Sequence, residues 1–259
     1  MRLYRGQQVT ASLLLREQVQ TQCSVVDRSS WYEPKIYYAF MSFIFSFFLS
    51  KTSINGILNR GGMFLFSTNQ LQEFLQIPAE WNPADKQLLD LGAGDGGITK
   101  KLAAFYGNVY VTEMSQVMQW RLRNEGFHLE DAEGWSSTSR QYNLISVLNL
   151  LDRHYNPRKL LANLHSLALR SNCLVLMAVV LPMHQYVEFH PSRKSTQADV
   201  KLILRGKTLE EQASFLVEKE FMPAGFELVR WTKLPYLCEG DFNRVSPCCF
   251  RKVVNVNVW

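Results

Sequence analysis

The feature that most constrains the fold is a glycine-rich stretch, LLDLGAGDGGIT, at residues 88–99. Apolar residues typical of a buried strand lead into it, and a segment with helical periodicity follows it. Gly92 and Gly94 permit backbone torsions that other residues avoid, and they let a ligand approach the main chain closely. The stretch therefore predicts a tight strand-to-helix turn of an α/β sheet at which a ligand can bind.

Strands and helices are expected to alternate after this turn. Further strands are expected at residues 108–114, 142–151, 172–182 and 226–234. Amphipathic helices are expected at residues 98–106, 117–126 and 157–169. The run at 142–151 is apolar almost throughout, as in a strand buried on both faces. Such alternation implies right-handed crossovers and a mainly parallel sheet.

The segment ahead of the turn has a different character. We expect residues 1–30 to form a weakly ordered arm, residues 31–80 a helical elaboration packed on the core, and residues 81–259 the core itself. Dense aromatic residues between Trp31 and Phe48 predict a helix packed into the core. A further helix is expected to begin after Ser67 as its N-cap, with an apolar stripe made of Leu71, Phe74 and Leu75.

Charge and cysteine content exclude several classes of protein. The formal charge of +5 comes from 28 basic and 23 acidic residues spread along the chain, which is unlike the basic stripe of a nucleic-acid-binding protein. The five cysteines contain no CxxC pair and no histidines have metal-ligand spacing, so we expect no metal, and reduced thiols in an intracellular protein. The longest apolar stretch, residues 36–50, is shorter than the roughly 20 residues that span a bilayer, although weak peripheral membrane contact stays open.

Acidic residues around the glycines indicate the kind of ligand. Gly92, Gly94 and Gly97 satisfy the GxGxxG pattern of dinucleotide-binding turns, and a bare glycine turn without a ligand is another interpretation. Asp90 and Asp95 would repel a pyrophosphate, whereas the ammonium of S-adenosyl-L-methionine can be neutralised by a carboxylate. Glu113, about 20 residues further on, can accept the ribose hydroxyls of either ligand. We therefore favour S-adenosyl-L-methionine over NAD.

A second group of candidates follows the strand at 142–151. Ligands of open α/β sheets bind outside the carboxyl ends of the strands, which brings Asn149 and Asp152 to the ligand. Asn149 could bond the cofactor or the substrate, and Asp152 could face a methyl acceptor. The structural alternatives are a satisfied turn amide for Asn149 and a helix cap before Pro157 for Asp152. Tyr236, in the segment LPYLCEGD, could cover the site or could be a core residue.

Several of these segments together resemble one known family. TSINGIL, LLDLGAGDGGITK, VTEMS, VLNLLDR, VLPMHQYVE and LPYLCEGD are similar to the DREV family, the methyltransferase-like-9 type of protein-histidine methyltransferase. The resemblance runs from about Trp31 to Asp241. It implies a Rossmann-like class I S-adenosylmethionine-dependent methyltransferase fold, with a mainly parallel sheet and a helical N-terminal elaboration.

The resemblance also implies an activity and roles. Such enzymes transfer a methyl group to the pros nitrogen of histidine in His-x-His motifs of proteins, leaving S-adenosyl-L-homocysteine. Glu113 would bind the ribose, Asn149 and Tyr236 would contact the cofactor, and Asp152 would hold the target imidazole. We expect a monomer with protein or peptide substrates, in the cytoplasm or associated with the endoplasmic reticulum or mitochondria.

Two features limit the resemblance. An apolar leader seen in some relatives is absent, and the tail after Asp241 departs from the usual family ending, although KVVNVNVW alternates as a strand does. Two other functions therefore stay open. One is methylation of a small molecule or another side chain, since fold does not settle the acceptor. The other is a catalytically inactive cofactor-binding module.

Overall fold

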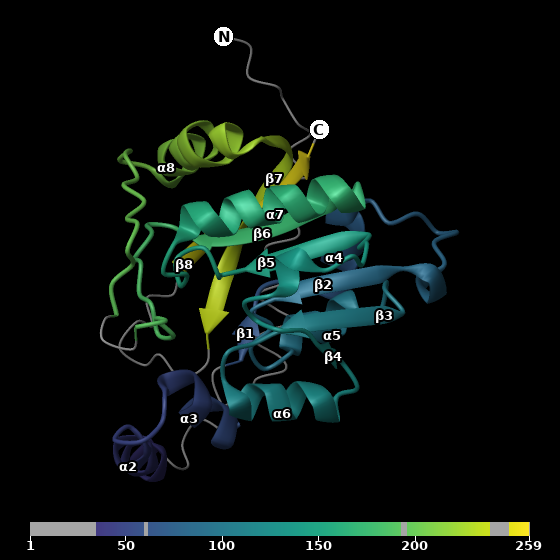
Figure 1. Cartoon of the computed structure of the whole chain (residues 1–259). Helices are drawn as coiled ribbons and strands as arrows, with labels where there is room; N and C mark the ends of the chain where they lie inside the picture. Colours follow the sequence, from purple (N-terminus) through teal and green to yellow (C-terminus); the bar gives the residue numbers. More distant parts are fainter. Residues whose placement is uncertain (1–34, 60–61, 193–195, 239–248, 259) are drawn as a thin grey trace.

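A computed structural model of the chain describes residues 35–59, 62–192, 196–238 and 249–258 (Figure 1). The strands of this part of the chain form one eight-stranded sheet in the order β1-β7-β8-β6-β5-β2-β3-β4. The strands are β1 (Met63–Phe64), β2 (Gln87–Leu91), β3 (Asn108–Thr112), β4 (His128–Leu129), β5 (Leu144–Leu148), β6 (Leu174–Val180), β7 (Phe226–Cys238) and β8 (Cys249–Val258). The expected strands and the mainly parallel sheet are confirmed.

Five of the eight strands pair in parallel, and the antiparallel pairings lie on one side of the sheet, among β6, β8, β7 and β1. Strands β6, β5, β2, β3 and β4 pair in parallel. β8 runs antiparallel to both of its neighbours, with Val254 opposite Met177 of β6 and opposite Trp231 of β7. The alternating sequence of the divergent tail therefore forms a strand inserted between β6 and β7, while the short β1 covers the outer edge of β7.

Helices cover both faces of the sheet. On one face, α7 (Pro157–Ser171) and α8 (Leu209–Leu216) pack over Leu89, Ile145 and Met177. On the other face, α4 (Thr68–Leu75), α5 (Gly97–Leu102) and α6 (Gln116–Asn124) pack over Leu88, Leu144 and Leu176. Neighbouring residues of each strand thus enter opposite cores, because side chains alternate across a sheet. This is why the central strands are apolar on both faces, as expected for β5, whose residues are all buried.

Helix ends agree with the local sequence signals. Ser67 caps α4 and forms a capping box with Gln70, as the sequence predicts. Pro157 occupies the first turn of α7 behind the Asn156 cap, and Gly126 follows α6 with a φ of 84°. The helix that follows α2 is α3 (Lys51–Ile57), which packs on α6. Gly56 allows this close approach, since a Cβ there would lie 2.8 Å from Val117 Cγ1.

One expectation for the N-terminal segment is wrong. The aromatic helix α2 (Lys35–Phe45) was predicted to pack into the core, but most of its aromatic side chains are exposed. Figure 1 shows α2 beyond α3, away from the sheet, so the helix has no core to enter. Elements later in this segment do join the core, through the pairing of β1 with β7 and of α4 with α5. Residues 1–34, including the predicted arm, lie outside the described residues.

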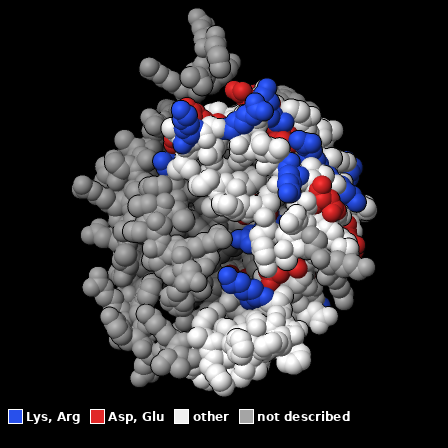
Figure 2. Space-filling model, turned by 90° about the vertical axis from the view of Figure 1, so that its left-hand side faces the viewer, with Lys and Arg blue, Asp and Glu red and all other residues white. Residues whose placement is uncertain are grey.

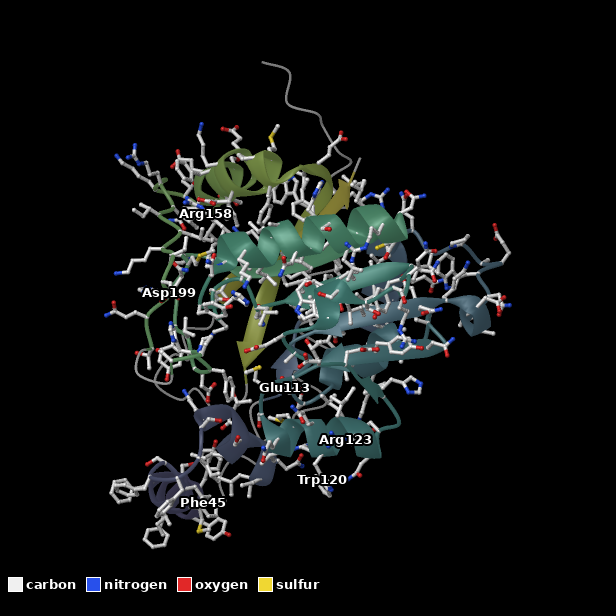
Figure 3. The ribbon with its side chains drawn as sticks, viewed as in Figure 1. Phe45, Glu113, Trp120, Arg123, Arg158 and Asp199 are labelled. Atoms are coloured by element: carbon white, nitrogen blue, oxygen red, sulfur yellow. The ribbon has the colours of Figure 1, made fainter. Side chains whose placement is uncertain are left out.

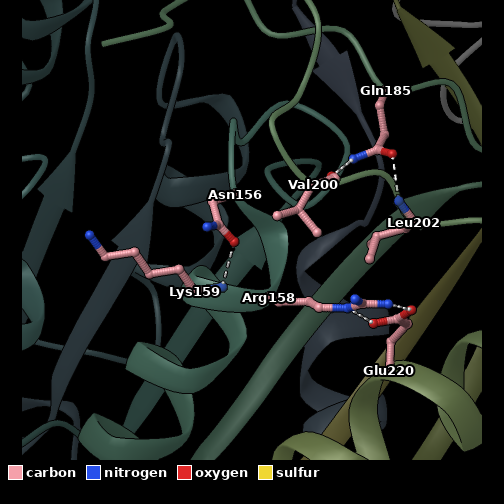
Figure 4. A network of polar contacts seen from close by, with 7 residues as sticks. All are labelled: Asn156, Arg158, Lys159, Gln185, Val200, Leu202 and Glu220. Atoms are coloured by element: carbon pink, nitrogen blue, oxygen red, sulfur yellow. Dashed lines mark hydrogen bonds and ion pairs between the residues drawn. The ribbon is translucent and has the colours of Figure 1, made fainter.

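The region between β6 and β7 contains helices that the sequence analysis did not predict. α8 begins at a capping box between Thr208 and Glu211, and it continues into a π-helix at Val217–Phe221 and a 3-10 helix at Met222–Ala224. Arg158 on α7 makes two hydrogen bonds of 3.0 Å to Glu220 of the π-helix (Figure 4). This bidentate pair fixes α8 and the π-helix against α7. Two further 3-10 helices lie at Pro83–Asp85 and Trp135–Ser137.

Candidate functional site

The glycine loop between β2 and α5 is held against the end of β3. Gly92, Gly94 and Gly96 have φ angles of 70°, 58° and 78°, a region that favours glycine. The N–H groups of Gly92 and Ala93 both donate to the Thr112 carbonyl, each over 3.0 Å. A Cβ added at Gly94 would meet no atom within 4 Å. The loop thus presents open space at one glycine, where a ligand can lie against the backbone.

Glu113 lies directly after β3, facing this loop. Its carboxylate accepts the Gly94 N–H over 3.0 Å and the Ser115 N–H over 2.8 Å, and Figure 3 shows it between the sheet and the helices α3 and α6. Burial raises the pKa of Glu113, and hydrogen bonds from the N–H groups of Ser115, Gly94 and Met114 partly oppose that rise. A carboxylate has about four acceptor positions, so Glu113 can still accept a ribose hydroxyl.

Asp90 lies beneath the loop and is buried in the sheet. Its carboxylate accepts hydrogen bonds from Thr99 of α5, over 2.6 Å, and from Ser146 of β5. Burial raises the pKa of Asp90 to about 6, and the two hydroxyl donors lower it by less. These contacts join β2, α5 and β5 under the ligand loop. Asp90 was predicted to neutralise the ammonium of the cofactor. Its carboxylate is buried and both of its oxygens accept hydrogen bonds from the protein. Its contact with an ammonium stays a prediction.

Asp95 lies within the loop and is half-buried. Its carboxylate accepts the N–H of Gly97 over 3.0 Å, at the first turn of α5. This bond fixes the direction in which the helix leaves the loop. Contact between Asp95 and a cofactor remains a prediction.

The second group of candidates lies after β5, next to the glycine loop, because β5 and β2 are neighbours in the sheet. Asn149 has a φ of 63° and donates its N–H to the Ala178 carbonyl over 3.0 Å. Asp152 is 2% exposed, and Arg153 Nε lies 3.5 Å from its Oδ2. The carbonyl of Asp152 accepts the N–H of Tyr186, whose ring lies 5.8 Å from the Arg153 guanidinium. The interpretation of Asp152 as a helix cap is wrong, since Asn156 caps α7 (Figure 4).

Hydroxyl groups of α3 extend this site, and the sequence analysis missed them. Ser53 Oγ lies 2.9 Å from Ser115 Oγ, and both side chains are buried. Ser115 also donates its N–H to Glu113, so α3 connects through one hydroxyl to the acid that faces the glycine loop. Thr52 donates its N–H and its hydroxyl to Glu188, over 2.8 and 2.6 Å. Ser115 could have been recognised as the N-cap of α6, whereas no local signal indicates the pairing of Thr52 with Glu188, 136 residues apart.

The remaining candidate, Tyr236, lies in β7 opposite Cys249 of β8. Its role in cofactor binding stays a prediction. The neighbouring acids Glu239 and Asp241 lie outside the described residues.

Taken together, one end of the parallel sheet carries an open glycine, a buried acid after β3 and a second buried acid after β5. The first two suit a nucleoside, because glycine gives room for the ligand and a carboxylate accepts hydroxyl groups. The third can orient a nitrogen-bearing acceptor by accepting one hydrogen bond. Within the described residues, no helix combines the length and apolarity needed to cross a membrane.

Comparison with known proteins agrees with this geometry. A family model described as DREV methyltransferase matches residues 6–251. A SAM-dependent methyltransferase from Anabaena variabilis ATCC 29413 is 12% identical over 80% of this chain and 92% of its own, with a TM-score of 0.50. The N-methyltransferase NodS from Bradyrhizobium japonicum WM9, in complex with S-adenosyl-L-homocysteine, is 15% identical over 74% of this chain and 84% of its own, with a TM-score of 0.46. The predicted Rossmann-like class I methyltransferase fold is confirmed.

Proposed function

The chain belongs to the DREV methyltransferase family, and from this premise we propose that it transfers a methyl group to the pros nitrogen of histidine in His-x-His motifs of proteins. The observation that carries the proposal is the buried Asp152 carboxylate after β5, beside the glycine loop. Residues 31–241 resemble protein-histidine methyltransferases, and this resemblance implies that the Asp152 carboxylate holds the imidazole of the target histidine.

The residues present fit S-adenosyl-L-methionine, which supplies an activated methyl group on its sulfonium. The open side of Gly94 leaves room for it against the backbone, and Glu113 has acceptor capacity for a ribose hydroxyl. We propose that Asp95 and Asn149, which follow β2 and β5, contact the cofactor. Asp90 supports the loop from below, through Thr99 and Ser146.

The proposed reaction requires Asp152 to accept a hydrogen bond, not to act as a strong base. Neutral imidazole is already a nucleophile, so no strong base is needed, but the attacking nitrogen must carry the lone pair. A carboxylate that accepts a hydrogen bond from the other ring N–H selects that tautomer and fixes the ring. As the pros nitrogen bonded to the methyl group, the bond from that methyl to the sulfonium sulfur would break and leave S-adenosyl-L-homocysteine. The nearby carboxylate would stabilise the positive charge that develops on the ring, and the proton on the other ring nitrogen would then pass to solvent. Positioning of the ring supplies the rest of the rate enhancement.

The compartment of this activity is also a proposal. We place the protein inside the cell, where its thiols stay reduced, in line with the irregular spacing of its cysteines. Cys173, in the described part of the chain, is a buried thiol without a disulfide, and burial raises its pKa to about 12. We further propose that the enzyme acts as a monomer on protein or peptide substrates.

The test is methyl transfer from labelled S-adenosyl-L-methionine to a peptide containing Ala-His-Ala-His, with cofactor affinity measured for each variant. We expect the wild type to label the pros nitrogen, and Asp152→Ala to bind cofactor normally while transfer falls at least about a hundredfold. Asp85→Ala, which removes an exposed carboxylate far from the loop, is the matched control and should keep full activity.

Three results would contradict the proposal. Transfer to a small molecule or to another side chain, with the histidine peptide unlabelled, would show that the acceptor is different. Cofactor binding without transfer to any acceptor would identify an inactive binding module. Equal transfer by Asp152→Ala and the wild type would remove Asp152 from the mechanism.

A further inference from the structure

An aromatic surface projects from the end of the molecule that carries α2. Tyr37, Phe40, Phe43, Phe47 and Phe48, which we call the aromatic patch, are 59%, 59%, 64%, 68% and 84% exposed. Three of the rings adjoin one another, with centroids 5.2 Å apart between Phe43 and Phe47 and 6.5 Å apart between Phe47 and Phe48. Soluble monomers rarely expose a continuous apolar area of this kind, so it indicates an interaction site.

The patch is anchored to the rest of the protein and faces away from it. Tyr38 donates its hydroxyl to Asn55 of α3 over 2.8 Å, which fixes one side of α2 on that helix. α3 in turn packs on α6 and reaches Glu113 through Ser53 and Ser115. Figure 2 shows an area of uncharged side chains at the end of the molecule that carries α2, with charged side chains of both signs directly above it and more of them toward the opposite end.

Basic residues predominate near the patch, and the acid Glu188 is engaged there by the N–H and the hydroxyl of Thr52. No aspartate or glutamate occurs between residues 35 and 72, whereas Lys35 and Lys51 stand at the two ends of the apolar stretch. On α6, Trp120 and Arg123 are exposed, and Figure 3 shows both at the same end of the molecule as Phe45 of α2. A partner of this face must therefore accept aromatic side chains and offer negative charge beside them.

An anionic bilayer surface meets both requirements. The uncharged stretch covers the 15 residues 36–50, too short to cross a bilayer but sufficient for a helix lying in its interface. Aromatic rings are favoured at the level of the headgroups, and basic residues at the rim are attracted by anionic lipid. Tyr37, Phe40 and Phe43 are spaced three residues apart and therefore lie on one face of α2, as an amphipathic helix in a membrane interface requires.

We propose that the aromatic patch binds the surface of anionic phospholipid bilayers, with α2 lying in the interface. The docking surface is separate from the methyl-transfer site, so it stands whether or not histidine is the acceptor. Because α2 is joined to α3 and α3 to α6, docking would hold the end of the sheet that carries Glu113 close to the membrane.

The proposal is tested by sedimentation of the full chain with vesicles of phosphatidylcholine containing about one fifth phosphatidylserine. We expect binding that weakens at high salt and on pure phosphatidylcholine. The triple substitution Phe43→Ser, Phe47→Ser and Phe48→Ser should lower the partition coefficient at least about tenfold. The matched control, Leu169→Ser with Ile203→Ser, removes exposed apolar side chains outside α2 and should bind as the wild type does.

A second measurement does not depend on the triple variant folding. Phe48→Trp places a fluorophore at the most exposed ring of the patch, and brominated lipids in the vesicles should quench its added emission. Absence of quenching, or vesicle binding by the triple variant equal to the wild type, would overturn the proposal. A dimer in sedimentation velocity that the triple substitution dissociates, with no vesicle binding by either protein, would also overturn the proposal. The patch would then join two copies of the chain. Peptide methylation measured in the same samples without vesicles should be unchanged by the triple substitution.

Discussion

At the scale of single residues, three buried acids near the glycine loop differ in the groups that contact them and in the effects that we expect from their substitution. Asp90 is held by Thr99 and Ser146, and Glu113 by backbone N–H groups. Asp152 lies beside Arg153. The sequence could identify Glu113 and Asp152 by their places after strands, because strand ends meet at one edge of a parallel sheet, and Asp90 by its place in the strand that leads into the glycine loop. It could not predict that Asp90 points into the core, since that depends on hydroxyls contributed by α5 and β5.

The burial of Asp90 makes stability depend on pH. Its pKa is about 6 in the folded protein and 3.8 in the unfolded chain, so the folded protein keeps this proton over a range in which the unfolded chain loses it. The contribution of Asp90 to the free energy of unfolding therefore falls by about 3 kcal/mol as pH rises from about 4 to 6, and it changes no further above that range.

Asp90→Asn removes this titration. We expect the free energy of unfolding of the variant, relative to that of the wild type, to rise by about 3 kcal/mol between about pH 4 and pH 7. Urea unfolding of both proteins over this range measures the difference in their free energies of unfolding. The contributions of the other carboxylates are the same in both proteins and cancel in this difference. A difference that stays constant with pH would mean that Asp90 is ionised in the folded protein throughout.

Glu113 offers a prediction about cofactor affinity. Glu113→Gln removes the charge, and it forces an amide NH₂ toward a backbone N–H that the carboxylate accepts. Hydrogen bonds to charged groups contribute about 1.5–3 kcal/mol, so affinity for S-adenosyl-L-homocysteine should fall about tenfold or more in calorimetric titration. Glu125→Gln, at an exposed glutamate paired with Lys100, is the control and should leave the affinity unchanged.

At the scale of elements, the sequence predicted the strands well, because their apolar runs are long and end at glycine, proline or acidic residues. It failed for α8, although Thr208 and Glu211 form the capping box that marks its start. It was wrong about α2, since a helix with aromatic residues on most sides was taken as buried. Periodicity shows that a segment is apolar, but it does not show whether another element lies over it.

The glycine loop provides an element-scale prediction with an internal control. Gly94 and Gly126 both have a positive φ, and a Cβ at either would meet no atom within 4 Å. Alanine at either position should therefore lower the free energy of unfolding by a similar amount, about 1–2 kcal/mol. Only Gly94→Ala should weaken cofactor binding, about tenfold or more, because its Cβ enters the space above the loop. Equal affinity in the two variants would place the cofactor elsewhere.

At the scale of the whole molecule, β8 joins the parallel strands β6, β5, β2, β3 and β4 to β7 and β1. It pairs with β6 along one side and with β7 along the other. Its place in the sheet could be predicted only in part, because KVVNVNVW alternates as a strand does but nothing local indicates its partners. The same holds for α3, whose contact with Glu113 through Ser53 and Ser115 joins segments 62 residues apart.

Proline in β8 tests this dependence. Val254→Pro removes an N–H from a strand with neighbours on both sides, whereas Val254→Ala keeps it. We expect the proline variant to lose at least about 3 kcal/mol, a fall in Tm of about 10 °C, and the alanine variant to lose much less. Thermal unfolding followed by circular dichroism compares them. Equal melting temperatures would show that β8 is dispensable to the sheet.

The position of β8 also has a consequence for the order of synthesis on the ribosome. Both strands that flank β8 are translated before it, so the nascent chain carries β6 and β7 with two unsatisfied edges until residues 249–258 emerge. Unpaired strand edges are sites of aggregation. A ribosome that stalls or terminates shortly before this point releases a product that lacks β8 and is poorly able to close its sheet. We therefore expect such products to depend on chaperones or to be degraded, whatever the condition of the catalytic residues upstream.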